Sequence, residues 1–132
     1  MNNDTTTMPA WKMAALLAAY TTYALWSSRD GNGIPLDQTG CIIAENTRKR
    51  FSADLQNFWN YCDKAIGKGW DNKEIRSERI AHYFWLCRNG EGSGFDDKNL
   101  GAFGRSLAEA SERFGPCKLY IRGGLIHASC PT

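Results

Sequence analysis

The segment CKLYIRGGLIHASC, residues 117–130, gives the clearest structural signal in the chain. Gly123 and Gly124 suit a two-residue hairpin turn, because both turn positions take positive φ, which glycine adopts without strain. With these glycines at the turn, Ile121 faces Ile126 and Tyr120 faces His127. The segment therefore predicts a C-terminal antiparallel β-hairpin that spans about residues 117–130.

Alternation along this hairpin separates an apolar face from a polar one. Successive strand residues point to opposite sides, which gives one face made of Cys117, Leu119, Ile121, Ile126, Ala128 and Cys130. The other face carries Lys118, Tyr120, Arg122, Leu125, His127 and Ser129. Turn, register and pattern agree, so the apolar face is expected to cover the core of the domain.

The same register brings two cysteines together. Cys117 and Cys130 fall on a non-hydrogen-bonded pair, whose Cα atoms lie about 4.5 Å apart, within reach of a disulfide. Whether the bond forms depends on the compartment, because cytosolic thiols are normally kept reduced.

Helical periodicity precedes the hairpin. Residues 41–66 are expected to form one helix, interrupted near 51–52 if at all, with a stripe of apolar residues: Phe51, Leu55, Phe58, Cys62 and Ile66. A second helix is expected over about 71–88, with Asp71 and Glu74 spaced as a capping box. A third is expected over about 97–114, capped by Asp96 or Asp97 and ended by Gly115-Pro116.

The N-terminal segment 8–26, MPAWKMAALLAAYTTYALW, predicts a further helix that is apolar nearly all round. Lys12 precedes an apolar run of about 14 residues, shorter than the roughly 20 that cross a membrane. We expect a retained helix of a cytoplasmic protein rather than a membrane span; export, with this segment as a signal or anchor, is the alternative. Turn residues fill the long loop 27–40 that follows.

Length and composition complete the fold prediction. The 132 residues are 42% hydrophobic and 23% charged, values typical of one folded domain. The expected domain, 1–132, is mainly α, with an apolar helix and loop over 1–40 and helices plus the hairpin over 41–132. Its class is a four- to five-helix domain with a C-terminal β-hairpin, in the order of a winged helix.

Signals for catalysis, cofactors or metals are weak. The chain has no Cys-x-x-Cys and only two histidines, His82 and His127, which argues against zinc. The loop 28–39 lacks the final glutamate of a calcium site. The glycine-rich stretch 90–94 lacks the Lys-Ser or Lys-Thr ending of a phosphate-binding loop and does not follow a predicted strand. We expect no enzyme activity, no cofactor, no metal and no small-molecule substrate.

Three segments resemble a known family: HYFWLCRNG (82–90), KNLGAFGRSL (98–107) and KLYIRGGLIHA (118–128). Over about residues 80–129 the chain is similar to the winged-helix modules of phage-type and viral-type primase–helicases. The resemblance implies that helix 97–114 recognises DNA and that the hairpin is the wing. The implied nucleic-acid-binding residues are Lys98, Asn99, Arg105, Lys118, Tyr120 and Arg122.

The alternative function is a protein-interaction module, a small regulator or inhibitor that docks on a larger complex. It depends on the aromatic side chains of the first helix, Trp11, Tyr20, Tyr23 and Trp26, because such residues are favoured at interfaces. The competing interpretation is that the same residues are simply buried in the core, as aromatic residues usually are. DNA binding requires the basic residues to share one exposed face, whereas protein binding requires an exposed aromatic patch.

Overall fold

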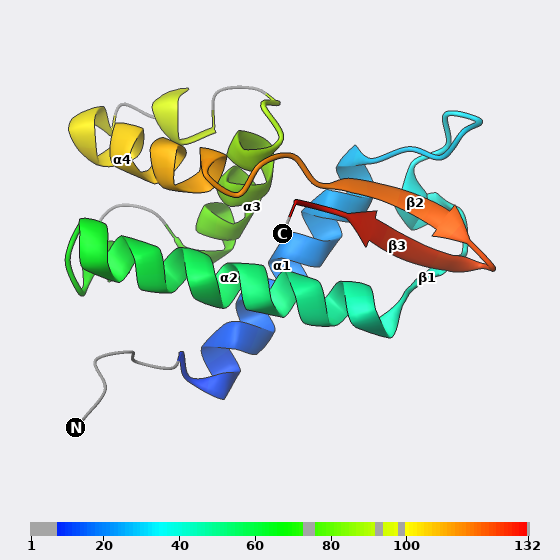
Figure 1. Cartoon of the computed structure of the whole chain (residues 1–132), viewed down its shortest axis with the longest axis horizontal. Coiled ribbons are helices and arrows are strands. Elements are labelled where there is room, and N and C mark those ends of the chain that lie inside the picture. Colours follow the sequence, from blue (N-terminus) through cyan, green and yellow to red (C-terminus); the bar gives the residue numbers. More distant parts are fainter. Residues whose placement is uncertain (1–7, 73–75, 92–93, 98–99, 132) are drawn as a thin grey trace.

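The computed structural model describes residues 8–72, 76–91, 94–97 and 100–131 of the chain (Figure 1). Within them are four α-helices: α1 (Ala10–Ser27), α2 (Glu45–Ala65), α3 (Ser77–Arg88) and α4 (Gly101–Glu112). Short 3₁₀ turns are η1 (Leu36–Gln38), η2 (Trp70–Asn72) and η3 (Gly94–Asp97). The strands are β1 (Ile42–Ile43), β2 (Lys118–Arg122) and β3 (Leu125–Ser129). A mainly helical domain with a C-terminal hairpin is thus confirmed.

The hairpin has the predicted register. β2 pairs antiparallel with β3, from Arg122 opposite Leu125 to Lys118 opposite Ser129. Gly123 and Gly124 form the turn with φ of 62° and 77°, values that a residue with a side chain rarely adopts. Ile126 is fully buried, whereas Tyr120 on the opposite face is 41% exposed. Beyond the paired residues, Cys117 and Cys130 form a disulfide, with their Cα atoms 4.2 Å apart.

A third strand was not predicted. Ile42 and Ile43 form β1, which runs parallel to β3 and gives the sheet order β1-β3-β2. The predicted helical start at Cys41 is therefore wrong, because Ile42 and Ile43 take part in the sheet and α2 begins only at Glu45. The amide of Ala44 and the hydroxyl of Thr47 both donate to the carbonyl of Ile126, at 2.9 and 3.1 Å. These bonds fix the start of α2 against the hairpin.

Two other predicted boundaries are wrong. α3 begins at Ser77 rather than near Asp71, which lies in η2, and Glu74 of the predicted capping box is outside the described residues. α4 begins at Gly101 with Leu100 at the N-cap position, so the predicted N-cap position at Asp96 or Asp97 is wrong. Gly101 has a φ of 62°, and a regular helix cannot continue backwards through that conformation.

The core contains the predicted stripe of α2. Phe51, Leu55, Phe58 and Cys62 are fully buried, and α2 continues through 51–52 without interruption. α1 contributes its own buried side, Leu16, Tyr20 and Ala24. The Tyr20 ring packs on Phe84 of α3 with centroids 5.4 Å apart. α1, α2 and α3 therefore share one aromatic core.

Candidate functional site

The four aromatic residues predicted to bind a partner lie in different environments. Trp11 and Trp26 are 73% and 61% exposed, far more than a core tryptophan. Tyr20 is fully buried among the core rings, so its prediction as a contact residue is wrong. Helical geometry is the reason, since Tyr20 shares the inner face of α1 with Leu16 and Ala24. Tyr23 is half-buried at the edge of the outer face.

The outer face of α1 carries no charge. Its exposed residues are Ala10, Trp11, Ala14, Ala15, Ala18, Thr22 and Trp26. Positions 11, 15, 18, 22 and 26 follow spacings of four, three, four and four, so they form one stripe along the helix. A solvated helix normally places charged residues on this side. The only charged residue of α1, Lys12, is half-buried and forms an ion pair with Asp71.

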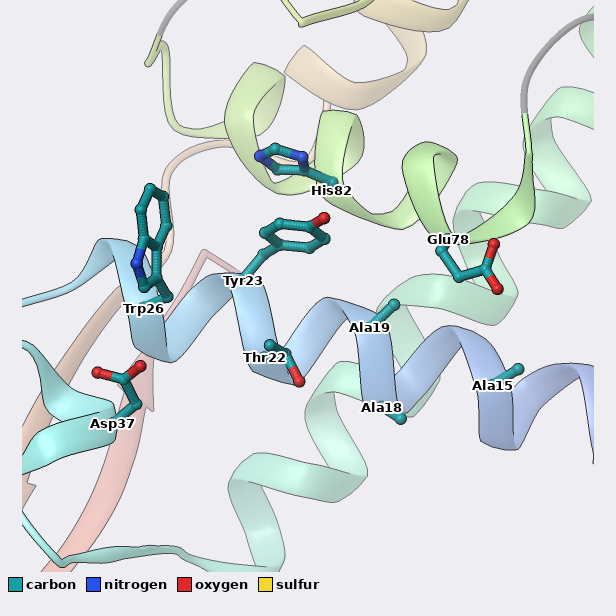
Figure 2. A pocket seen from close by; sticks show the side chains of 9 residues that line it. All are labelled: Ala15, Ala18, Ala19, Thr22, Tyr23, Trp26, Asp37, Glu78 and His82. Atoms are coloured by element: carbon teal, nitrogen blue, oxygen red, sulfur yellow. The ribbon is translucent and has the colours of Figure 1, made fainter.

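A groove of about 660 Å³ runs along this face (Figure 2). Small side chains from α1 line its length: Ala15, Ala18, Ala19 and Thr22. At one end Tyr23 stacks on His82 of α3, with ring centroids 3.7 Å apart and planes 6° from parallel. Trp26 stands beside this pair in Figure 2. The groove is thus shallow along α1 and bounded by rings at one end.

Two carboxylates border the groove. Asp37 of η1 lies at the Trp26 end, and Glu78 of α3 lies above the alanines (Figure 2). Both residues are exposed. The site therefore combines an apolar floor with an acidic border and can hold apolar side chains.

Sequence reasoning missed most of this groove. Glu78 and His82 are distant in sequence from α1, and Asp37 is in the long loop after it, whose path the sequence does not specify. The alanines could have been found, because Trp11, Ala15, Ala18, Thr22 and Trp26 already share a helical stripe in the sequence.

Among the residues implied to bind DNA, Lys98 and Asn99 lie outside the described part of the chain. Arg105 is on α4, where it forms ion pairs with Glu109 at 3.4 Å and Glu112 at 3.3 Å. These carboxylates neutralise much of the positive charge that a phosphate would need. The two contacts are half-exposed and dissociate at low energetic cost.

The remaining three predicted DNA contacts lie together on the outer face of the hairpin. Lys118, Tyr120 and Arg122 are all exposed. The Arg122 guanidinium is 5.8 Å from the centre of the Tyr120 ring, which stacks on His127. The hairpin extends away from α4, and its turn points to the far side of the molecule (Figure 1). Arg122, at the turn end of β2, is therefore remote from the α4 helix.

Among the residues that the structure describes, no three histidine, cysteine or carboxylate side chains gather as metal ligands do. Burial raises the pKa of the Cys62 thiol, which opposes its ionisation to a reactive thiolate. Over the same described residues, none of the helices is both long and apolar enough to cross a membrane.

Comparisons of this chain with models of known protein families, with characterised proteins and with solved structures found no match.

Proposed function

We propose that this protein is a non-enzymatic interaction module that binds a protein partner through the outer face of α1. The observation that carries the proposal is the uncharged stripe of α1, which bears an exposed tryptophan near each end and lies along a groove of about 660 Å³. Large apolar patches on soluble proteins commonly mark interaction sites.

The chemistry of the stripe resembles that of a protein interface. Tryptophan is enriched among the residues that contribute most to binding energy, because its ring buries a large area with few rotatable bonds. Trp11 and Trp26 lie 15 positions apart, about 22 Å along the helix axis. Alanine and threonine between them leave room for a second helix to approach closely.

The charge pattern disfavours a nucleic-acid partner at this face. Asp37 and Glu78 border the groove, and carboxylates repel phosphate. A protein segment can instead bury apolar side chains along α1 while its polar groups stay hydrated at the rim.

A photo-cross-linking experiment tests the proposal. The residue at Ala18 is replaced by p-benzoylphenylalanine, which reacts on illumination with any chain within a few ångströms. Lys49, exposed on α2, takes the same replacement as the matched control. We expect protein adducts from position 18 and none from position 49 when the full chain is expressed in its source cells. Equal adducts from both positions, or none from position 18, would contradict the proposal.

A further inference from the structure

The order of residues along α1 points to a particular partner, and the inference rests on the proposed function. We propose that the outer face of α1 binds the α1 helix of a second copy of this chain. The two helices run antiparallel, and the twofold axis passes between Ala18 and Ala19. In this register Trp11 meets Trp26 of the second copy, Ala15 meets Thr22, and Ala18 meets Ala19.

The stripe is self-complementary in this register. A twofold dimer uses the same surface on both copies, so every pair must fit when the two members are exchanged. Here the pairing matches large rings with large rings at both ends and small side chains with small side chains at the centre. Because the central residues are alanine and threonine, the helix axes can approach to the short end of the usual 8–10 Å range.

Electrostatics favours the antiparallel arrangement over a parallel one. Antiparallel helices place the positive end of each helix dipole next to the negative end of the other. Asp37 lies at the Trp26 end of each groove (Figure 2). A parallel pair would bring the two Asp37 carboxylates to the same end of the dimer, whereas an antiparallel pair separates them. The stripe itself contains no charge, and the Glu78 carboxylate, which borders the groove beside the alanines, must stay hydrated at the rim of the interface.

Burial of the tryptophans gives the dimer its driving force. Trp11 and Trp26 are largely exposed in the single chain, and each would be covered by its counterpart from the second copy. The Tyr23–His82 stack and Trp26 form a wall against which the incoming tryptophan can pack. The uncharged outer face of α1, which is unusual for a solvated helix, then becomes the buried centre of the dimer interface.

Disulfide trapping tests the register. Ala15→Cys and Thr22→Cys are prepared separately in the full chain, one with a larger tag, and are then mixed and oxidised. Because position 15 faces position 22 of the other copy, we expect the mixed cross-linked species in the mixture. Each variant alone should stay at the low level of the unsubstituted protein, whose half-buried Cys41 sets the baseline. Identical positions would be about 10 Å apart along the axis, beyond the reach of a disulfide.

Cross-linking of each variant with itself, without a mixed species, would overturn the antiparallel register. Sedimentation of the unsubstituted protein over a hundredfold concentration range provides the second readout. We expect a monomer–dimer equilibrium that Trp11→Ala combined with Trp26→Ala weakens at least tenfold. A monomer throughout would overturn the dimer. Adducts from position 18 to a different protein would then still support the proposed function, so the two failures are distinguishable.

Discussion

Arg88 and Asp54 form an ion pair inside the domain, with the guanidinium Nη1 2.7 Å from the carboxylate Oδ2. The Arg88 side chain has no exposed surface, and its nitrogens also donate to the Tyr20 hydroxyl and to the carbonyls of Phe114 and Gly115. These bonds join α1, α2 and α3 to the turn that leads into the hairpin. The arginine therefore connects the helical core to the sheet.

Replacement of Arg88 tests how much this connection contributes to the free energy of unfolding. Arg88→Ala leaves Asp54 buried without its main partner and leaves two carbonyls without donors, so we expect a loss of about 3–5 kcal/mol in the free energy of unfolding. Arg50→Ala is the matched control, since Arg50 also contacts Asp54, at 3.1 Å, but its side chain is 31% exposed. We expect the control to lose under about 1 kcal/mol. Urea denaturation measures both, and equal losses would contradict this account.

Alkaline pH should destabilise the fold. Burial raises the pKa of the Tyr20 hydroxyl above its ordinary value of about 10, although the nearby Arg88 opposes the shift. Burial likewise raises the pKa of Cys62, with Asp63 adding to the shift. The unfolded chain therefore releases these protons at lower pH than the folded chain does. The contribution of these two groups to stability is constant below their unfolded pKa values and is lost as pH rises through about 9 and then 10.

A tyrosine variant separates the two contributions. Tyr20→Phe lowers stability at pH 8 by about 1.5–3 kcal/mol, because a hydrogen bond to the charged Arg88 is lost. The further decline between pH 10 and 11 should be smaller in the variant than in the unsubstituted protein. Urea midpoints at pH 8, 10 and 11 measure this difference. Parallel curves for the two proteins would show that Tyr20 does not control the alkaline slope.

The sequence predicts best where its signals are local. Gly123-Gly124 and the alternation around it specify the hairpin register, and the four-three-four spacing of Phe51, Leu55 and Phe58 specifies the buried side of α2. β1 was missed because two isoleucines gain strand structure only from pairing with β3, more than 80 residues away. Arg88 was missed as a core residue because its partners are distant in sequence.

The tryptophans of α1 show a second limit of prediction from sequence. Composition predicts that the aromatic residues of α1 take part in partner binding or in the core. Only the orientation of the helix shows that Trp11 and Trp26 face solvent while Tyr20 does not. Burial depends on how α1 packs against α2 and α3, and the nearly uniform apolar pattern of α1 leaves that orientation open.

Gly104 is expected to be intolerant of a side chain. A Cβ atom at this position would lie 2.6 Å from the carbonyl oxygen of Phe95, so η3 and α4 can pack closely only around glycine. Gly104→Ala should lower stability by about 1–3 kcal/mol, despite the higher helix propensity of alanine. Ser106→Ala, at an exposed position of the same helix, should leave stability unchanged or raise it slightly. Thermal denaturation of both variants checks the contrast; a stabilised Gly104→Ala would refute it.

Nucleic-acid binding remains a prediction from the resemblance to winged-helix modules, and it can be weighed directly against the proposed function. Under the proposed function, labelled duplex and single-stranded DNA should show no salt-sensitive rise in fluorescence anisotropy when the protein is added. Arg105 is already paired with two glutamates, and Arg122 is at the turn end of β2, on the hairpin that extends away from α4. Binding that weakens with salt, and again in Arg105→Ala and Arg122→Ala, would support the DNA-binding interpretation instead.

The Cys117–Cys130 disulfide closes the hairpin just beyond its last paired residues. The two cysteines are 13 positions apart, and a covalent loop of that size stabilises a fold by about 3 kcal/mol, mainly by restricting the unfolded chain. Cys117→Ala with Cys130→Ala should therefore lower the melting temperature. A reductant breaks the same bond, so it should lower the melting temperature of the unsubstituted protein to about that of the double variant. The melting temperature of the double variant should not change. Cys41→Ala is the control, since this cysteine carries no disulfide and the variant should still respond to reductant. A reductant that destabilises the double variant equally would show that the hairpin disulfide is not the redox-sensitive element.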